Sequence, residues 1–303
     1  RLTEADAAAR IAGVQATTDY AALADTDLVI EAVFEDIAVK RAVFAELARA
    51  CRPDAILATN TSYLDPRAIA EGLPDPARFI GLHFFSPANV MKLLEIVPTP
   101  ETAREALATG FALAARLKKI PVQAGICDGF IGNRILKRYR AAAEALVRAG
   151  TPVAAVDAAM RGYGFAMGPF EAQDLGGLDI AFLQREGARA RGESVTETLG
   201  DILVRAGRKG QKTGGGWYDY APGDRKPQPS ATTAALLAPE IAPGAAPADV
   251  AAHLVAEMAA EGEAILAEGI AAQPADIDLV EIHGYGFPRR RGGPMFAARL
   301  STN

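Results

Sequence analysis

Residues 28–62, LVIEAVFEDIAVKRAVFAELARACRPDAILATNTS, contain the pattern that decides the fold. Two short apolar runs, at 28–33 and 55–58, are rich in branched residues and bounded by polar turns, as buried strands are. Between them Asp36 stands where a helix N-cap is expected. Apolar residues then follow at the spacing of one helical face: Val39, Val43, Phe44 and Leu47. The segment predicts two strands joined by a crossover helix, which is typical of a parallel sheet covered by helices.

The same alternation continues to residue 122 and then stops. Three further apolar runs are interpreted as strands, at 79–82, 93–97 and, on an edge of the sheet, 120–122. Thr99 is expected to cap a helix whose first position is Pro100. From about residue 130 to Gly150 an alanine-rich helical pattern takes over, so the chain is expected to change from an α/β region to an all-α region.

The helical part contains a repeat and a proline-rich stretch. Residues 221–247 carry six prolines, which predicts a linker laid over the surface. On either side of it, Gly-Tyr-Gly-Phe at 162–165 and Gly-Pro at 168–169 match the same residues at 284–287 and 293–294. Because the order and spacing also match, we expect a duplicated helical unit. Three domains are predicted, covering residues 1–122, 123–225 and 226–303.

Composition excludes several classes of protein. With 50% hydrophobic and 23% charged residues among 303, the chain is predicted to fold into globular domains. The net charge of -5 argues against nucleic-acid binding, which needs a basic surface. Two cysteines, Cys51 and Cys127, build neither a disulfide framework nor a cysteine-rich zinc site, and no metal site is predicted. Without a membrane span or a secretory signal near Arg1, the chain is expected to be cytoplasmic.

Polar residues follow the predicted strands, and there the chemistry is expected. Glu35 follows the first strand, Asn60-Thr61-Ser62 the second, and His83 the third. In an open parallel sheet ligands bind outside the carboxyl ends of the strands, so these residues should face one crevice. Glu95 falls inside the next strand, where a charge needs a partner, and His83 could be that partner as a general base. The alternative is an edge strand that leaves Glu95 in water.

At these residues the chain resembles the L-3-hydroxyacyl-CoA dehydrogenase family. The resemblance is carried by six motifs, which are EAVFE at 31–35, NTS at 60–62, HFFSPA at 83–88, MKLLE at 91–95, DGFIGNR at 128–134 and GGWYDY at 215–220. It implies a Rossmann-like, mostly parallel sheet followed by a duplicated all-α region of the 6-phosphogluconate-dehydrogenase C-terminal type. The duplication resembles multifunctional β-oxidation enzymes.

The resemblance also implies roles for single residues. His83 would remove the hydroxyl proton of a 3-hydroxyacyl-CoA while Glu95 orients it, and Ser62 and Asn133 would bond the reacting oxygen or the thioester. The implied cofactor is NAD rather than NADP. Residues on its side are Ala32, Val33, Glu35, Lys40, Asn60, Ser62 and Ser86. Many members carry asparagine at the position of Ser86.

Other expectations concern the whole protein. The family's first strand and its Gly-x-Gly-x-x-Gly turn are not found, and residues 1–6 resemble the segment after the second strand, so the sheet is expected to lack its first strands. The implied partners are an acyl-CoA substrate and either an upstream enoyl-CoA hydratase domain or a thiolase, with monomer and dimer both open. The alternatives are a dehydrogenase of another 3-hydroxy acid, a non-catalytic homologue such as a lens crystallin, and an inactive fragment.

Overall fold

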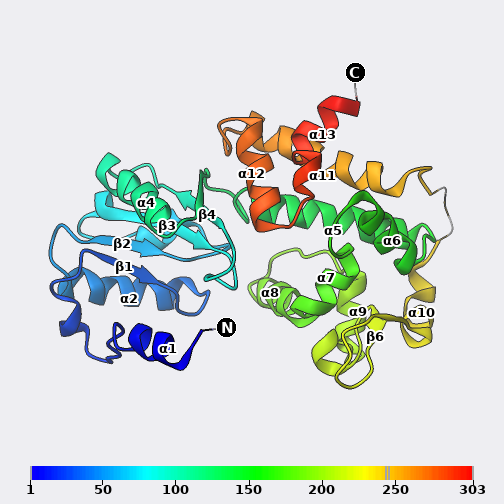
Figure 1. Ribbon diagram of the computed structural model, residues 1–303, viewed down its shortest axis with the longest axis horizontal. Helices are drawn as coiled ribbons and strands as arrows, with labels where there is room; N and C mark the ends of the chain where they lie inside the picture. Colours follow the sequence, from blue (N-terminus) through cyan, green and yellow to red (C-terminus); the bar gives the residue numbers. More distant parts are fainter. Residues whose placement is uncertain (1, 243, 245, 302–303) are drawn as a thin grey trace. The chain divides into compact units, whose positions relative to one another are not determined.

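The computed structural model describes residues 2–242, 244 and 246–301. The chain divides into two compact units, one comprising residues up to 90 together with 94–128, and the other comprising 91–93 and the residues from 129 onward (Figure 1). The division between the units lies at 128/129, whereas the sequence predicted a change at 122/123 and a third domain from 226. That three-part division stays a prediction.

The first unit contains a five-stranded sheet in the order β1-β2-β3-β4-β5. Its strands are β1 (Leu28–Glu31), β2 (Ile56–Thr59), β3 (Phe79–Phe84), β4 (Leu93–Val97) and β5 (Ile120–Gln123). The pairs β1–β2 and β2–β3 are parallel, and β3–β4 is antiparallel. This confirms the prediction of a mostly parallel sheet with helices. Its first strand is shorter than expected, because Ala32 and Val33 lie beyond β1.

Helices cover both faces of this sheet, as Figure 1 shows. They are α2 (Ile37–Ala50), α3 (Pro66–Ala70) and α4 (Arg104–Arg116). The unit also contains helix α1 (Glu4–Ile11), which has no buried residue, and the short 3-10 turns η1 (Tyr20–Leu23) and η2 (Pro76–Arg78). Phe44 of α2 packs in one cluster with Leu57. On the opposite face, Ala114 of α4 packs in another cluster with Ala58. Because successive strand residues alternate between faces, neighbouring positions of β2 serve two different cores.

The two predicted helix starts in this unit had different outcomes. Asp36 caps α2 as predicted, since its carboxylate accepts the backbone N–H of Val39 at 2.9 Å. The prediction that Thr99 caps a helix at Pro100 is wrong, because α4 begins at Arg104. Instead, the Thr99 N–H donates to the Thr102 hydroxyl oxygen at 2.8 Å and Thr102 donates to the carbonyl of Phe79. The two threonines therefore form a turn that is attached to β3.

The second unit is helical. Its helices are α5 (Gly132–Arg148), α6 (Val153–Tyr163), α7 (Pro169–Gly176), α8 (Leu178–Ala190), α9 (Leu199–Arg205), α10 (Ala231–Leu237), α11 (Val250–Ala267), α12 (Pro274–Gly284) and α13 (Pro294–Ser301). Short elements are the hairpin of β6 (Tyr218–Asp219) and β7 (Gln228–Pro229), and the turns η3 (Gln211–Thr213), η4 (Ala238–Glu240) and η5 (Arg289–Arg291).

The prediction that 221–247 is a surface linker is wrong in its middle part. Ser230 caps α10 through the N–H of Thr233, and Leu237 of this helix is buried. No proline lies between residues 230 and 238, so the backbone N–H groups needed for a helix are present. The proline-rich composition of the whole stretch therefore hid a short helix that packs into the unit.

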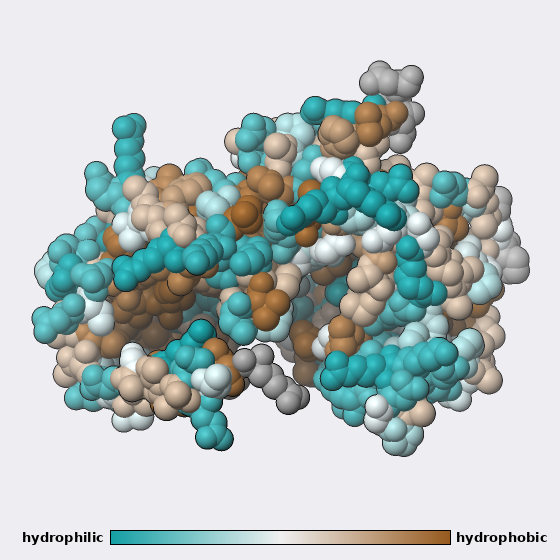
Figure 2. Space-filling view, in the orientation of Figure 1, coloured by the Kyte–Doolittle hydropathy of each residue, from teal (hydrophilic) through white to brown (hydrophobic). Residues whose placement is uncertain are grey.

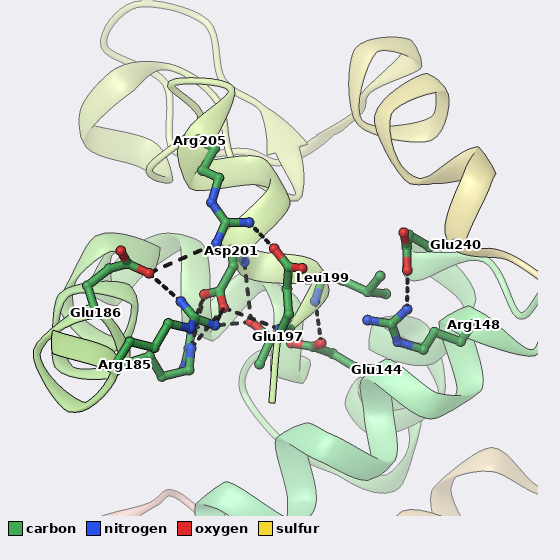
Figure 3. A network of polar contacts seen from close by, with 11 residues as sticks. Glu144, Arg148, Arg185, Glu186, Glu197, Leu199, Asp201, Arg205 and Glu240 are labelled. Atoms are coloured by element: carbon green, nitrogen blue, oxygen red, sulfur yellow. Dashed lines mark hydrogen bonds and ion pairs between the residues drawn. The ribbon is translucent and has the colours of Figure 1, made fainter. Parts of the chain in front are cut away.

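A polar network joins three helices of the second unit, as Figure 3 shows. Asp201 of α9 is fully buried and accepts hydrogen bonds from Arg185 of α8. The carboxylate of Glu144, on α5, accepts the N–H of Leu199 at 2.7 Å. Burial raises the pKa of Glu144, although the N–H of Leu199 acts in the opposite direction. These contacts attach the start of α9 to both α5 and α8.

Both sequence repeats use one buried aspartate in the same way. Asp157 of α6 accepts the N–H groups of Phe170 and Glu171 at the start of α7. Asp278 of α12 accepts those of Met295 and Phe296 at the start of α13. A Cβ at Gly168 or Gly293 would lie 2.2 or 2.1 Å from the aspartate oxygen, so each helix start requires a glycine there. The duplicated sequence therefore has the same local structure twice.

Asp278 is expected to make stability depend on pH in a defined window. Burial raises its pKa to about 6, against the opposite effect of the Met295 and Phe296 N–H groups. The folded-state pKa of Asp278 is above the unfolded value of about 3.9, so the Asp278 carboxyl group stabilises the folded state in its protonated form. Its contribution to the free energy of unfolding is fully present below roughly pH 4 and is lost as the pH rises through about 6. The Asp278→Asn variant does not titrate there. Between those pH values the wild type should therefore lose about 2 kcal/mol relative to this variant.

Urea unfolding of both proteins at several pH values measures this difference. The exposed Asp224→Asn variant is the control, and its difference from the wild type should be the same at every pH. Equal pH dependence of the wild type and Asp278→Asn would contradict the assignment.

Some apolar side chains reach the surface of the first unit, where Figure 2 shows hydrophobic areas between hydrophilic ones. Phe34 is 86% exposed, and Ile30 and Val33 are also exposed beside it at the end of β1. Among the described residues there is no helix with the length and apolar character needed to cross a membrane.

Candidate active site

His83 and Glu95 form a buried pair in the first unit. They lie directly opposite each other in the antiparallel ladder of β3 and β4, so their side chains leave the same face of the sheet. The distance from His83 Nδ1 to Glu95 Oε2 is 2.7 Å, and the two residues are 4% and 0% exposed. Since β4 has β5 on its other side, the alternative of an edge strand with Glu95 in water is wrong. The predicted pairing is confirmed.

Hydrogen bonds tie the ends of the neighbouring strands to this pair. The side-chain oxygen of Asn60 accepts the backbone N–H of Phe84, the residue after His83, at 2.8 Å. The Asn60 N–H donates to the carbonyl of Glu31 at the end of β1. The ring of Phe85 lies 4.4 Å from the imidazole ring, measured between centroids. The strand ends therefore converge as expected, with Asn60 as the link between β1 and β3.

Glu35 holds the turn that follows β2. Its Oε1 accepts the Thr61 hydroxyl at 2.6 Å and the N–H groups of Ser62 and Tyr63 at 2.8 and 3.0 Å. Burial alone would raise the pKa of Glu35, but these hydrogen bonds and the charge of Lys40 outweigh it, so the pKa lies below the usual value. Glu35 is thus an ionised group that fixes the backbone at Ser62.

Lys40 of α2 holds two carboxylates at once. Its Nζ lies 2.8 Å from Glu31 and 3.3 Å from Glu35, and its side chain is 1% exposed. The other oxygen of Glu31 accepts the hydroxyl of Thr59 at 2.7 Å. Glu31 is the functional residue that sequence reasoning missed, although an acid at the end of a strand, nine residues before a lysine at the start of a helix, is a readable signal. The ammonium group acts here by positioning Glu35.

The remaining predicted residues take different places. Ala32 and Ser86 are exposed, Ser86 in the connection from β3 to β4, and the N–H of Val33 donates to Glu31. Asn133 belongs to the second unit, in the first turn of α5, where its side-chain oxygen accepts the hydroxyl of Tyr285. Their predicted roles stay predictions. Within the described ranges, no three His, Cys, Asp or Glu side chains are grouped as metal ligands would be.

Comparison with known proteins shows which family models and which relatives match this chain. The model of the 3-hydroxyacyl-CoA dehydrogenase NAD binding domain matches residues 1–127, and that of the 3-hydroxyacyl-CoA dehydrogenase C-terminal domain matches residues 129–220. The peroxisomal bifunctional enzyme of Danio rerio is 43% identical over 298 residues, which are 92% of this chain and 42% of that protein. The chain thus spans about two fifths of this curated relative.

Two solved structures are similar. One is the 3-hydroxybutyryl-CoA dehydrogenase from Escherichia coli, with a TM-score of 0.83, 28% identity and coverage of 99% of this chain and 80% of that one. The other is the dehydrogenase part of multifunctional enzyme 1 from C. elegans, with a TM-score of 0.69, 30% identity and coverage of 95% and 67%. This chain therefore belongs to the 3-hydroxyacyl-CoA dehydrogenase family, and its first 127 residues correspond to the NAD-binding domain of that family.

Proposed function

We propose that this protein oxidises (S)-3-hydroxyacyl-CoA thioesters to 3-oxoacyl-CoA with NAD⁺, as a step of fatty-acid β-oxidation. The observation that carries the proposal is the buried His83–Glu95 pair, with 2.7 Å between Nδ1 and Oε2. A histidine oriented by a carboxylate is suited to remove a hydroxyl proton near neutral pH. A similar protein named as a 3-hydroxybutyryl-CoA dehydrogenase supports the substrate class, and a relative from Oryza sativa named as a peroxisomal fatty acid beta-oxidation multifunctional protein supports the pathway.

Glu95 determines which imidazole nitrogen does the chemistry. Because the Glu95 carboxylate accepts the hydrogen on Nδ1, Nε2 is the nitrogen that takes the proton from the 3-hydroxyl. The imidazolium that forms is stabilised by the same carboxylate. Glu95 has no exposed surface, so solvent does not weaken this attraction as it would for a pair in water.

The residues around Glu35 fit a nicotinamide cofactor. The Glu35 side chain is 34% exposed and ionised, so it can accept hydrogen bonds from ribose hydroxyls, while buried Lys40 keeps it in place. When bound, NAD⁺ would supply the acceptor for the hydride that leaves C3 of the substrate. Ser62, whose N–H is held by Glu35, is proposed to donate its hydroxyl to the reacting oxygen. Asn133 is proposed to bond the thioester carbonyl.

The wider setting is also a proposal. The Danio rerio relative is named bifunctional and more than half of its length lies outside the match, which supports an enoyl-CoA hydratase domain in the parent protein. A thiolase partner and either a monomer or a dimer are proposed on the resemblance alone, and a cytoplasmic location stays the expectation drawn from the sequence.

The function is tested by measuring the oxidation of NADH with acetoacetyl-CoA as the substrate. The reaction is monitored by the loss of NADH absorbance, and the protein is used as it occurs naturally. We expect turnover with the CoA thioester and none with free acetoacetate, because Asn133 is proposed to recognise the thioester carbonyl. Turnover of free acetoacetate alone would favour a dehydrogenase of another 3-hydroxy acid. A folded protein that turns over neither would be a non-catalytic homologue.

A further inference from the structure

Tyr285, which comes from the second repeat, lies against the residue proposed to bind the substrate thioester. Its hydroxyl donates to the side-chain oxygen of Asn133 at 2.9 Å. Tyr285 follows the last residue of α12, and Asn133 is in the first turn of α5. The two residues are far apart in sequence but belong to the same compact unit. The contact therefore links the proposed substrate residue to the duplicated part of the chain.

Two glycines that precede Asn133 are closely packed, one against Asn133 itself and the other against Tyr285. A Cβ at Gly132 would lie 2.2 Å from Cε2 of the Tyr285 ring, so the ring rests directly on the backbone at the start of α5. A Cβ at Gly129, whose φ is 81°, would lie 2.8 Å from the Cβ of Asn133. Close packing of this kind limits a side chain to few rotamers.

Ion pairs attach the same turn of α5 to the second repeat. Arg134, the next residue, donates from Nε to Glu261 of α11 at 2.6 Å and from Nη2 to Glu268 at 2.7 Å. One turn later, Arg138 donates to Glu257 at 2.7 Å. Arg134 is only 17% exposed, so these charges are partly shielded from solvent. The position of α11, and of α12 after it, is thereby fixed relative to Asn133.

The direction of the hydrogen bond determines what Asn133 presents. Its amide has one accepting oxygen and one donating NH₂ group on opposite sides of the same carbon. With the Asn133 oxygen accepting from the Tyr285 hydroxyl, the Nδ2 hydrogens are the part of the amide that can donate to a carbonyl oxygen. If the amide were rotated by 180°, the Asn133 oxygen would face the thioester carbonyl oxygen. Both atoms are hydrogen-bond acceptors, so substrate binding would be weaker.

The equivalent tyrosine of the first repeat does not have this arrangement. Tyr163 has Arg291 above its ring, at 4.5 Å from the centroid, and Phe287 beside it at 5.9 Å. Within the described ranges, no hydrogen bond from the Tyr163 hydroxyl to a side chain is found. The contact with Asn133 is therefore specific to the second copy and is not a general requirement of the repeated fold.

We propose that Tyr285 is a positioning residue, which orients Asn133 so that its amide donates to the thioester carbonyl of the substrate. The inference rests on the proposed function of Asn133. It gives the second repeat a part in substrate recognition, although that repeat carries none of the residues proposed to touch the substrate or the cofactor.

The test is the Tyr285→Phe variant, which removes one oxygen and keeps the ring on Gly132. We expect kcat/KM for acetoacetyl-CoA to fall about 5- to 10-fold, in keeping with the loss of one hydrogen bond, and its affinity measured by calorimetry to fall by a similar factor. The KM for NADH should not change. Tyr163→Phe is the matched control and should keep the full kcat/KM.

A double-mutant cycle separates positioning from general stability. In an Asn133→Ala background, Tyr285→Phe should have no further effect on kcat/KM, because the group that it orients is gone. An equal loss in both backgrounds would overturn the inference. If Asn133→Ala is impaired and Tyr285→Phe is not, the inference alone fails. If Asn133→Ala is as active as the wild type, the proposed role of Asn133 fails and the inference falls with it.

Discussion

Replacing His83 with glutamine is expected to lower kcat for acetoacetyl-CoA reduction by about 10³-fold, within the range that general acid–base catalysis contributes. Glutamine is close to histidine in size and can still donate to Glu95, but its amide does not exchange a proton near neutral pH. Because neither His83 nor Glu95 is placed among the residues on the cofactor side, NADH affinity should be retained. The measurements are steady-state NADH oxidation and calorimetric binding of NADH.

Two further variants sharpen this experiment. Glu95→Gln should cause a smaller loss, of about 10- to 100-fold, because the imidazole remains but loses the charge that orients it and stabilises its protonated form. His253→Gln, which alters a half-buried histidine of the second unit, should leave kcat unchanged. A His83→Gln enzyme that kept a tenth or more of the wild-type kcat would rule out His83 as the general base.

Replacing Lys40 with methionine is expected to lower the free energy of unfolding by about 3–5 kcal/mol, the cost of removing one partner from a buried ion pair. Lys40 is the cation beside Glu31, and both side chains are excluded from solvent. In the variant, the buried Glu31 carboxyl group would be left with the Thr59 hydroxyl and the Val33 N–H as its hydrogen-bond partners. Urea unfolding measures the change.

A second substitution identifies the cause of that loss. In the Lys40→Met/Glu31→Gln double variant the uncompensated charge is gone, so part of the lost stability should return. Lys118→Met, at an exposed position of the same unit, is the control and should change stability by less than about 0.5 kcal/mol. If Lys40→Met unfolds at the same urea concentration as this control, the buried charges do not stabilise the unit as argued.

The sequence was sufficient to predict the sheet, the family and the His83–Glu95 pair. A glutamate inside an apolar run strongly indicates a buried polar pair, because burying a charged group costs free energy unless a partner compensates it. His83, at the end of the neighbouring strand, was the candidate partner. The roles assigned to Ser62, Asn133 and the residues on the cofactor side have not been tested by the structure, although the contacts of Glu35 and Lys40 give them a physical basis.

Other features depend on contacts that a local pattern does not contain. The predicted start of α4 at Pro100 is wrong because the Thr102 hydroxyl donates a hydrogen bond to the carbonyl of Phe79, which is distant in sequence. Helix α10 was missed because composition over 27 residues outweighed a short stretch without proline. In the sequence, Tyr285 is recognisable only as part of a repeated motif. Nothing near it in sequence indicates that its hydroxyl reaches Asn133.

The antiparallel pairing of β3 with β4 has a consequence for how such enzymes can diversify. Residues 85–92 connect the two strands, while the backbone ladder alone sets His83 opposite Glu95. A parallel neighbour would have needed a crossover of a dozen residues or more. Insertions or exchanges in this connection therefore change what surrounds the histidine and leave the proton-transfer pair in register. The register of His83 and Glu95 is in this way independent of the length of the segment that joins the two strands, so this segment can change without rebuilding the pair.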